Sequence, residues 1–519
     1  MKMKKYSAIF FLVSMVLLGC SVFSQNTTTA HVQKRPNILF VVSDDQSYPH
    51  ASAYGYKAVS TPNFDKVATN GILFTNAYVA SPGCSPSRAA ILTGRNDWQI
   101  EEAGTHGSSF PLKYKVYPQL LEDVGYKSGY TGKGWGPGDW KISGYKTNPA
   151  GKEYNAVKFT DQPEGVSNVN YAENFRQFYL EKKSDQPFCF WFGAHEPHRK
   201  FSKGIGLKNG KKLEDVVVPD FLPDTKEIRS DILDYCFEIE WFDQQLGKIL
   251  NQLEASGELE NTLVIVTSDN GMAFPRAKAN AYEYGIHVPL AISWPAKIRK
   301  KVVVNTIFST VNLAPTFLEV AGIKNAQLKY PMAGKSILNK LLQPAAKENK
   351  DLAYSARERH SSARYNNQGY PQRSLRDGDY LYIKNFKPYL WPAGNPFSLV
   401  KDAKSSEMVV SDYGAFYDID DSPSLRYMVK NKDDKAIAYY LRQATDKRPE
   451  EELFNIKNDP ACLKNLAGEK DFINIRTTLK NKLGNYLKTT EDPRQTGNGD
   501  IFETYPRLEG GIRDFPKSE

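Results

Sequence analysis

The chain has 519 residues and a formal net charge of +9 at pH 7, from 68 lysines and arginines against 59 aspartates and glutamates. This length allows a large buried core and one large domain with a smaller one beside it. The positive charge favours an anionic partner. Because the basic residues are scattered and form no recognised nucleic-acid-binding motif, nucleic acid is excluded as the expected partner.

The first 24 residues predict an export signal. Lysines at positions 2, 4 and 5 precede an apolar run from Ala8 to Leu18 that is too short to span a membrane stably. The sequence allows two positions for the end of this signal. The stretch 17–20 resembles a bacterial lipobox, which would place a lipid on Cys20, whereas Ser24 would end a cleaved signal peptide. We therefore expect an exported protein of a Gram-negative-type bacterium, either periplasmic or an outer-membrane lipoprotein, with no other membrane contact.

Three continuous apolar runs predict buried strands that end in polar side chains. The run 38–43 leads into Asp44 and Asp45, the run 188–193 leads into His195, and the run 263–267 leads into Asp269 and Asn270. Such runs are typical of strands buried on both faces of a parallel sheet. Because ligands bind at the carboxyl edge of such sheets, we expect these side chains to form one site.

Helical patterns separate the strands, at Tyr117–Val124 and over a long stretch from Ile228 to Leu253 with three-and-four apolar spacing. The alternation predicts an α/β fold with a large doubly wound mixed sheet flanked by helices. From about residue 340 the chain becomes more charged and richer in tyrosine. We expect the main α/β domain at 35–345, a smaller C-terminal α+β subdomain at 346–490, and a tail at 491–519.

The most informative stretch is 84–95, which reads Cys84-Ser85-Pro86-Ser87-Arg88-Ala89-Ala90-Ile91-Leu92-Thr93-Gly94-Arg95. One alternative is a loop entering a helix, with Pro86 in the first turn and Cys84 as an ordinary buried thiol. The stretch resembles the signature of the type I sulfatases, formylglycine-dependent members of the alkaline-phosphatase-like superfamily. The resemblance implies that a maturation enzyme oxidises Cys84 to formylglycine, whose hydrate attacks sulfate esters.

Oxygen-bearing side chains at two strand ends suit a hard divalent cation. Each pair alone could instead be a helix cap or a turn. The resemblance implies a calcium ion, with magnesium as the weaker alternative, held by Asp44, Asp45, Asp269, Asn270 and the modified Cys84.

Three basic residues are candidates for holding the sulfate and stabilising its charge. Arg88 lies one helical turn after Cys84, and a guanidinium binds an oxyanion through paired donors. Lys133 lies in a glycine-rich turn, and Lys278 lies in a segment that keeps the family's spacing to a Glu-x-Gly element. Taken singly, both lysines could be solvated surface charges. The resemblance implies that both bind substrate and act in catalysis.

The stretch 194–198 resembles the family's H-x-P-H element, in which the first histidine, here His195, donates a proton to the leaving group. The alternative for both His195 and His198 is a structural histidine. One position departs from the family: Trp135 stands where a histidine often follows the active-site lysine. His106 and His287 are the candidates to replace it.

Two stretches, 217–225 and 268–275, look most like the heparan N-sulfatase (sulfamidase) branch and bacterial polysaccharide sulfatases. The resemblance implies an exported sulfatase that removes O-sulfate, or N-sulfamate, from a sulfated polysaccharide or its oligosaccharides, such as ulvan, carrageenan or heparan-type glycans. Candidates for sugar contact, against the alternative of a solvated charged face, are Arg357, Arg359, His360 and Arg373. The tail from 491 is either loosely ordered or lies over the active site.

Two other functions remain as alternatives. One is a phosphomonoesterase or phosphonate hydrolase of the same superfamily, because phosphate and sulfate have similar shapes. The other is a surface lipoprotein that binds glycan with a catalytically dead site.

Overall fold

The structure is a computed structural model that describes residues 34–324, 328–344, 351–396, 399–401, 408–410 and 416–508. The predicted export signal with Cys20 and the end of the predicted tail lie outside these residues. The chain from Arg35 onward forms one structural unit.

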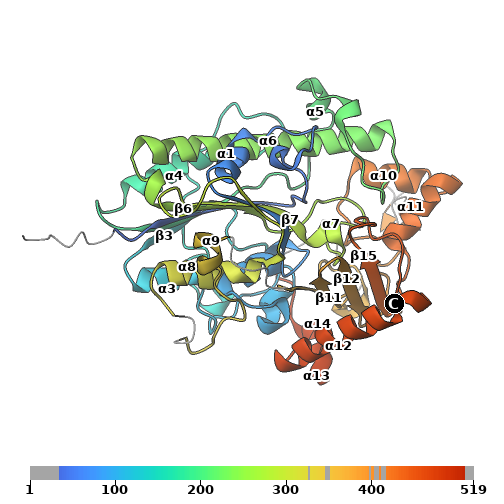
Figure 1. Cartoon of the computed structure of the whole chain (residues 1–519). Coiled ribbons are helices and arrows are strands. Elements are labelled where there is room, and N and C mark those ends of the chain that lie inside the picture. Colours follow the sequence, from blue (N-terminus) through green and yellow to red (C-terminus); the bar gives the residue numbers. More distant parts are fainter. Residues whose placement is uncertain are drawn as a thin grey trace, which may run out of the picture. The chain divides into compact units, whose positions relative to one another are not determined.

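A large mixed sheet forms the centre of this unit (Figure 1). Its strands lie in the order β4-β3-β5-β1-β6-β7-β2-β8, and β9 also pairs with β2. The neighbours β3, β5, β1 and β6 are all parallel, while β7 runs antiparallel to β6 and β2. The predicted fold class is therefore confirmed. The bounds are β1 (Asn37–Ser43), β2 (Ile72–Tyr78), β3 (Lys127–Gly132), β4 (Lys152–Glu153), β5 (Phe188–Gly193), β6 (Thr262–Ser268), β7 (His287–Ser293), β8 (Val302–Val304) and β9 (Phe308–Ser309).

Both faces of the sheet are covered by helices. Along β1, Phe40 and Val42 pack into one hydrophobic cluster, and Leu39 and Val41 pack into another on the opposite face. The first cluster includes residues of α2 (Cys84–Thr93), α3 (Tyr117–Asp123) and α8 (Leu313–Val320). The second includes residues of α1 (Pro62–Thr69), α4 (Tyr171–Leu180) and α6 (Lys226–Ala255). The continuous apolar run of β1 follows from burial on both sides.

The two helices expected between the strands are α3 and α6. The α6 helix begins at a capping residue, Thr225, whose side chain accepts a hydrogen bond from Ile228 N. Its carboxyl half packs on the sheet, whereas its amino half, including Ile232 and Ile239, joins a separate cluster with the C-terminal part of the chain. The long apolar stripe of α6 therefore serves two cores.

A smaller antiparallel sheet, with strand order β10-β11-β12-β15, forms the C-terminal part, and α12 packs on it (Figure 1). Its first strand reaches the main sheet, since Ala356 N donates to Ala80 O at 2.8 Å. The boundaries expected near residues 345 and 491 stay predictions. The remaining elements are β10 (Ala353–Arg357), β11 (Gln372–Asp377), β12 (Tyr380–Asn385), β13 (Leu399–Lys401), β14 (Met408–Val410), β15 (Glu451–Asn455), α5 (Ile205–Lys208), α7 (Glu283–Ile286), α9 (Leu338–Leu342), α10 (Pro423–Lys430), α11 (Lys435–Thr445), α12 (Ile473–Thr489), α13 (Pro493–Thr496) and α14 (Ile501–Thr504).

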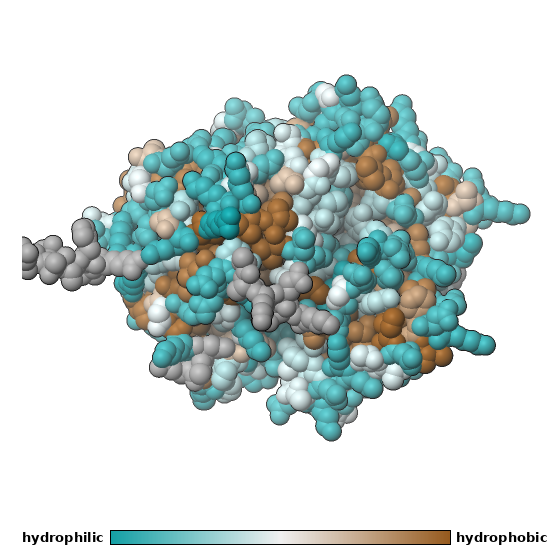
Figure 2. Space-filling model, in the orientation of Figure 1, coloured by the Kyte–Doolittle hydropathy of each residue, from teal (hydrophilic) through white to brown (hydrophobic). Residues whose placement is uncertain are grey.

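Among the described residues, no helix combines the length and apolarity that crossing a membrane requires. On the face in Figure 2, hydrophobic residues form separate patches among hydrophilic ones. Four cysteines are described, and all four are buried free thiols: Cys84, Cys189, Cys236 and Cys462.

Candidate active site

Cys84 is the first residue of α2 and is almost fully buried. Its Sγ lies 3.2 Å from His106 Nε2. Burial raises the pKa of the Cys84 thiol to about 11, although Lys133 and Lys278 act in the opposite direction. Because the thiolate is the reactive form, the unmodified thiol is a weak nucleophile at neutral pH.

Four of the five predicted metal ligands, those that follow β1 and β6, lie together because these strands pair in parallel, with Ser43 opposite Ser268. Asp45 adopts a φ of 73°, and its backbone N donates to Asp269 Oδ1 at 3.1 Å. Asn270 Nδ2 donates to Asp45 Oδ1 at 2.7 Å. The two strand ends therefore bring their side chains to one point, as expected from the sequence.

These oxygens fit a hard cation. Asp44 Oδ1 and Asn270 Oδ1 are buried and have no hydrogen-bond partner, which is a costly arrangement without a ligand. Asp44, Asp45 and His198 also offer ligand atoms that lie within 4.8 Å of one another. His198 is the member of this group that the sequence did not assign to the metal. The acidic cluster can therefore hold a metal ion.

Three cations neutralise the three aspartates of the cluster. Lys133 Nζ lies 2.6 Å from Asp44 Oδ2, and Lys278 Nζ lies 2.6 Å from Asp45 Oδ2. Arg88 Nε lies 2.6 Å from Asp269 Oδ2. Burial by itself would raise the pKa of Asp44, but Lys133 and Arg88 outweigh it and hold that pKa well below its usual range.

His195 follows β5 and is fixed through its backbone. Its N donates to Tyr171 Oη at 3.1 Å, and Tyr171 Oη donates to Glu196 Oε2 at 2.8 Å. Glu196 O also accepts from Asp44 N at 2.9 Å, which joins the loop after β5 to the end of β1. His195 is exposed to the solvent of the cavity, but the protein that surrounds its ring, followed by the charge of Lys133, lowers its pKa to about 4.

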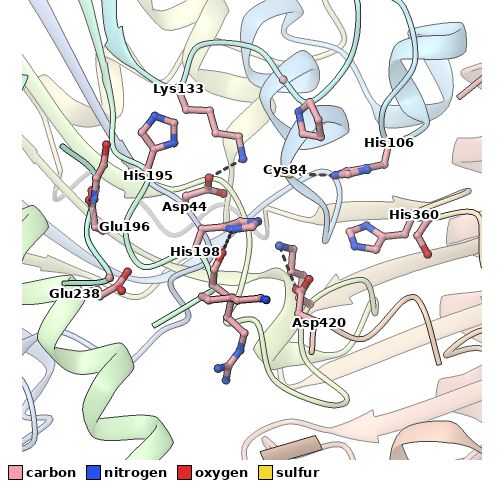
Figure 3. Close-up of a pocket in the computed structure, with 18 of the residues that line it drawn as sticks. Asp44, Cys84, His106, Lys133, His195, Glu196, His198, Glu238, His360 and Asp420 are labelled. Carbon is pink, nitrogen blue, oxygen red and sulfur yellow. Dashed lines mark hydrogen bonds and ion pairs between the residues drawn. The ribbon is translucent and has the colours of Figure 1, made fainter. Parts of the chain in front are cut away.

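A cavity of about 840 Å³ opens over these residues (Figure 3). Six of the predicted site residues line it: Asp44, Cys84, Lys133, His195, Lys278 and His360. Arg88, Asp45, Asp269 and Asn270 are buried beside it. The sequence did not single out several other lining residues, including Glu196, Glu238, Tyr417, Asp420 and Arg507. Of these residues, only Glu196 could have been found from the sequence, because it lies inside the 194–198 motif.

The structure distinguishes between the two histidines considered for the position of Trp135. His106 contacts Cys84 and lines the cavity. His287 lies elsewhere, with Nδ1 2.9 Å from Glu283 Oε1 and its ring stacked on Tyr48. Trp135 is buried and donates from Nε1 to Ser85 O at 3.0 Å, so it supports the first turn of α2.

Three of the four candidates for sugar contact do not line the cavity. Arg357 Nη2 lies 2.8 Å from Asp418 Oδ2, and Arg373 is held by two carboxylates, those of Asp492 and Glu358. Arg359 donates to Thr105 and Ser108. All three are buried. Their positions therefore give the predicted sugar contact no support, whereas His360 does face the cavity (Figure 3).

Two family models match the chain. Residues 36–323 match the sulfatase model, and residues 276–387 match the C-terminal model of N-sulphoglucosamine sulphohydrolase. Since the first match covers more than half of the chain, the protein belongs to the sulfatase family.

Individual relatives agree with this assignment. The chain is 26% identical over 497 residues to an ulvan-active sulfatase of Formosa agariphila, covering 90% of this chain and 77% of that protein. It is 27% identical over 495 residues to N-sulphoglucosamine sulphohydrolase of Homo sapiens, covering 88% of this chain and 91% of that protein. The predicted type I sulfatase with heparan N-sulfatase and bacterial relatives is confirmed, and the enzyme is a sulfuric ester hydrolase.

The fold is shared with solved structures. BT4656, solved with its substrate D-glucosamine-2-N,6-O-disulfate, matches with a TM-score of 0.60 at 19% identity. The match covers 88% of this chain and 99% of that chain.

Proposed function

We propose that this sulfatase removes sulfate groups from a sulfated polysaccharide or its oligosaccharides through a formylglycine made from Cys84. The observation that carries the proposal is the position of Cys84. It begins α2 in the wall of a large cavity that Lys133 and Lys278 also line. Burial raises the pKa of its thiol to about 11, and the charges of the two lysines offset only part of that rise. The relatives include an ulvan-active sulfatase, N-sulphoglucosamine sulphohydrolase and an N-acetylglucosamine-6-O-sulfatase, which supports a sulfated glycan as substrate.

A formylglycine at position 84, made by a separate maturation enzyme, supplies as its hydrate one hydroxyl to attack sulfur and a second to release the sulfate. The start of α2 suits this position because the N–H groups of a first helical turn attract an anion. The high pKa of the thiol argues against Cys84 acting unmodified.

Asp44, Asp45, Asp269 and Asn270, together with the side chain at position 84, are the residues that would hold a calcium ion. Their all-oxygen donor set and the two unpartnered buried oxygens support calcium over softer metals. Such an ion supplies positive charge beside the sulfate and favours loss of a proton from the attacking hydroxyl.

Lys133 and Lys278 bind the sulfate and stabilise the negative charge that develops on its oxygens. Arg88, which is buried beside the cavity and paired with Asp269, adds positive charge close to them. All three are buried or nearly so, and a charge acts more strongly where water is excluded. His195 donates a proton to the leaving oxygen or nitrogen. The surroundings of the ring lower the pKa of His195 and favour its neutral form, whereas the negative charge of a bound sulfate raises that pKa. Substrate binding therefore prepares His195 to carry the proton that it donates.

His106 takes the place of the histidine that Trp135 replaces. Its Nε2 is within hydrogen-bond distance of the side chain at position 84, and its Nδ1 is buried without a partner. Its role in the proposal is to hold a hydroxyl of the hydrated aldehyde in position.

The proposal covers both O-sulfates and N-sulfates, because both present an –SO3⁻ group to residue 84. The proposal includes export, either to the periplasm or to the outer membrane through a lipid on Cys20. The support for export is the signal predicted in the first 24 residues.

The test uses protein matured in its native host. Desalted heparin-type and algal oligosaccharides are screened for free sulfate, and an aryl sulfate is compared with the matching aryl phosphate. We expect sulfate release from at least one glycan and a Cys84 peptide whose mass shows conversion of the thiol to an aldehyde. Faster release of phosphate would favour a phosphomonoesterase. An unmodified thiol with no sulfate release would favour a glycan-binding lipoprotein.

A further inference from the structure

The last described stretch of the chain, residues 492–508, begins in a buried network of charges. Arg373 Nε lies 2.7 Å from Asp492 Oδ2, and Arg373 Nη2 lies 2.8 Å from Glu358 Oε1. Arg494 Nη2 completes the network at 2.7 Å from Glu358 Oε2. Buried ions are costly unless each is paired, and here two guanidiniums meet two carboxylates. The network therefore fixes the start of this C-terminal segment.

The other end of the segment is fixed at the rim of the cavity. Arg359 Nη1 donates to Tyr505 O at 2.5 Å, Ser108 Oγ donates to Pro506 O at 3.1 Å, and Leu508 N donates to Gly107 O at 2.6 Å. Arg359 directly precedes His360, and Gly107 directly follows His106. The segment is therefore bound to the two stretches that carry the histidines facing Cys84 in Figure 3.

Between these attachments, Arg507 enters the wall of the cavity. It is partly exposed, and its Nη1 donates to Ser362 Oγ at 3.3 Å. Burial is the main cause of the lowered pKa of His106, and Arg507 lies close enough for its charge to add to that effect. Arg507 thus lies on the Cys84, His106 and His360 side of the cavity.

Three other cations that line the cavity are paired with carboxylates, and Lys200 also lines it. Lys133 and Lys278 lie against Asp44 and Asp45, where the reacting sulfate would bind. Both terminal nitrogens of Arg199 lie 2.8 Å from the two carboxylate oxygens of Asp231. Arg507 comes from a separate element, so it is placed to meet a group of the substrate other than the reacting sulfate.

We propose that Arg507 binds a second oxyanion of the glycan, a carboxylate or a further sulfate, while the first sulfate lies at residue 84. This inference rests on the proposed function. A guanidinium stays charged at any working pH and offers paired donors that match either oxyanion. The buried arginines at 359 and 373, first considered for sugar contact, hold the segment that carries Arg507.

The experiment compares Arg507→Ala, Arg507→Lys and, as a matched control, Arg176→Ala. Arg176 is an exposed arginine of α4 that pairs with Glu173. The substrates are an aryl sulfate, the two monosulfated glucosamines, glucosamine-2-N,6-O-disulfate, and a heparin-derived disaccharide with its carboxylate intact or reduced to an alcohol.

For Arg507→Ala we expect KM to rise about tenfold on substrates with a second anion, equivalent to about 1.4 kcal/mol. We expect kcat on those substrates, and both constants on the aryl sulfate, to stay within about twofold. Arg507→Lys should recover part of the loss, and Arg176→Ala should match wild type. A loss confined to the disulfate assigns a sulfate as the second anion, and a loss confined to the intact carboxylate assigns a carboxylate.

An equal loss on the aryl sulfate and the glycans, or no loss on either, would overturn the proposal. Calorimetry measures the affinity of the same saccharides for Cys84→Ser protein, with and without Arg507→Ala. Because this protein does not turn over the substrate, the measurement tests the role of Arg507 in binding alone. Absence of sulfate release from every substrate would count against the proposed function, whereas equal affinities in the calorimeter would count against Arg507.

Discussion

Burial sets the chemistry of single side chains around residue 84. It raises the pKa of the Cys84 thiol to about 11 and that of the Glu196 carboxyl to about 7, and the protein that surrounds the ring of His195 lowers the pKa of that residue to about 4. Asp44 differs because Lys133 and Arg88 outweigh its burial. The cluster therefore keeps a charged carboxylate beside a thiol that is protonated at neutral pH, and a protonated thiol is a weak nucleophile.

Cys84→Ala should abolish sulfate release and leave the fold intact. The substitution removes one buried sulfur, which costs on the order of 1 kcal/mol of stability, but it leaves nothing at this position to oxidise. Sulfate release is measured by ion chromatography, and folding by thermal denaturation. Continued sulfate release would remove Cys84 from the mechanism.

His50 should make the protein less stable as the pH falls. Burial lowers its pKa to about 3 in the folded protein, against 6.5 as the ordinary value. The unfolded chain therefore takes up the proton first, and the contribution is fully present above about pH 6.5 and declines below it. Relative to wild type, His50→Gln should gain about 2 kcal/mol between pH 7 and pH 5. Urea unfolding at both pH values measures this; a difference that is independent of pH would contradict it.

At the scale of elements, the site depends on strands that end at one edge of the sheet. β3 and β5 approach closely at their carboxyl ends, where Lys133 N donates to Gly193 O at 2.7 Å. Gly132 has a φ of 75°, and a Cβ there would lie 1.9 Å from Gly193 O. Glycine is needed at this position both for the backbone conformation and for space. The parallel pairing of β3 with β5 brings Lys133 and His195 to the same cavity.

Gly132→Ala should therefore lower both stability and activity. The positive φ alone costs about 1–2 kcal/mol for an alanine, and the clash with Gly193 O should move Lys133. Gly257→Ala is the matched control, since Gly257 has a φ of 70° and open space around it. Urea unfolding and kcat/KM are measured for both. If both variants lose the same stability and keep full activity, the close approach of β3 and β5 does not hold Lys133 in place.

At the scale of the whole molecule, the site is assembled from both sheets and from the end of the chain. The cavity is lined by residues from Asp44 to Arg507. The smaller sheet contacts the chain just after β2 of the main sheet, through Ala356 and Ala80, and His360 follows its strand β10. Loss of the C-terminal part would therefore remove one wall of the cavity as well as part of the core.

Calcium should stabilise the protein, because an ion that binds only the folded state adds a stability that grows with the logarithm of the ratio of its concentration to Kd. At a calcium concentration one hundred times Kd, the gain is about 2.7 kcal/mol. Thermal denaturation with calcium, with magnesium and with a chelator measures the shift in Tm. Asp45→Asn, which keeps the side-chain shape, should lose most of the calcium-dependent shift. An equal shift in that variant would place the ion elsewhere.

Much of the fold and part of the site could be predicted from local patterns. The runs ending at Asp44, His195 and Asp269 indicated buried parallel strands, because burial on both faces demands continuous apolar residues. The motif at 84–95 indicated the family, and the alternation of strands and helices indicated the α/β class. Each of these signals is contained in a short stretch of chain.

Only the tertiary structure decided which distant residues meet. It brought His106 rather than His287 to Cys84, placed Arg357, Arg359 and Arg373 in buried contacts, and put Arg507 into the cavity. The sequence alone does not distinguish an arginine that pairs with a carboxylate inside the protein from one that binds substrate. The difference depends on contacts between residues far apart in the chain, such as Arg357 with Asp418 and Arg373 with Asp492. These contacts exist only once the sheets and the C-terminal segment have packed together.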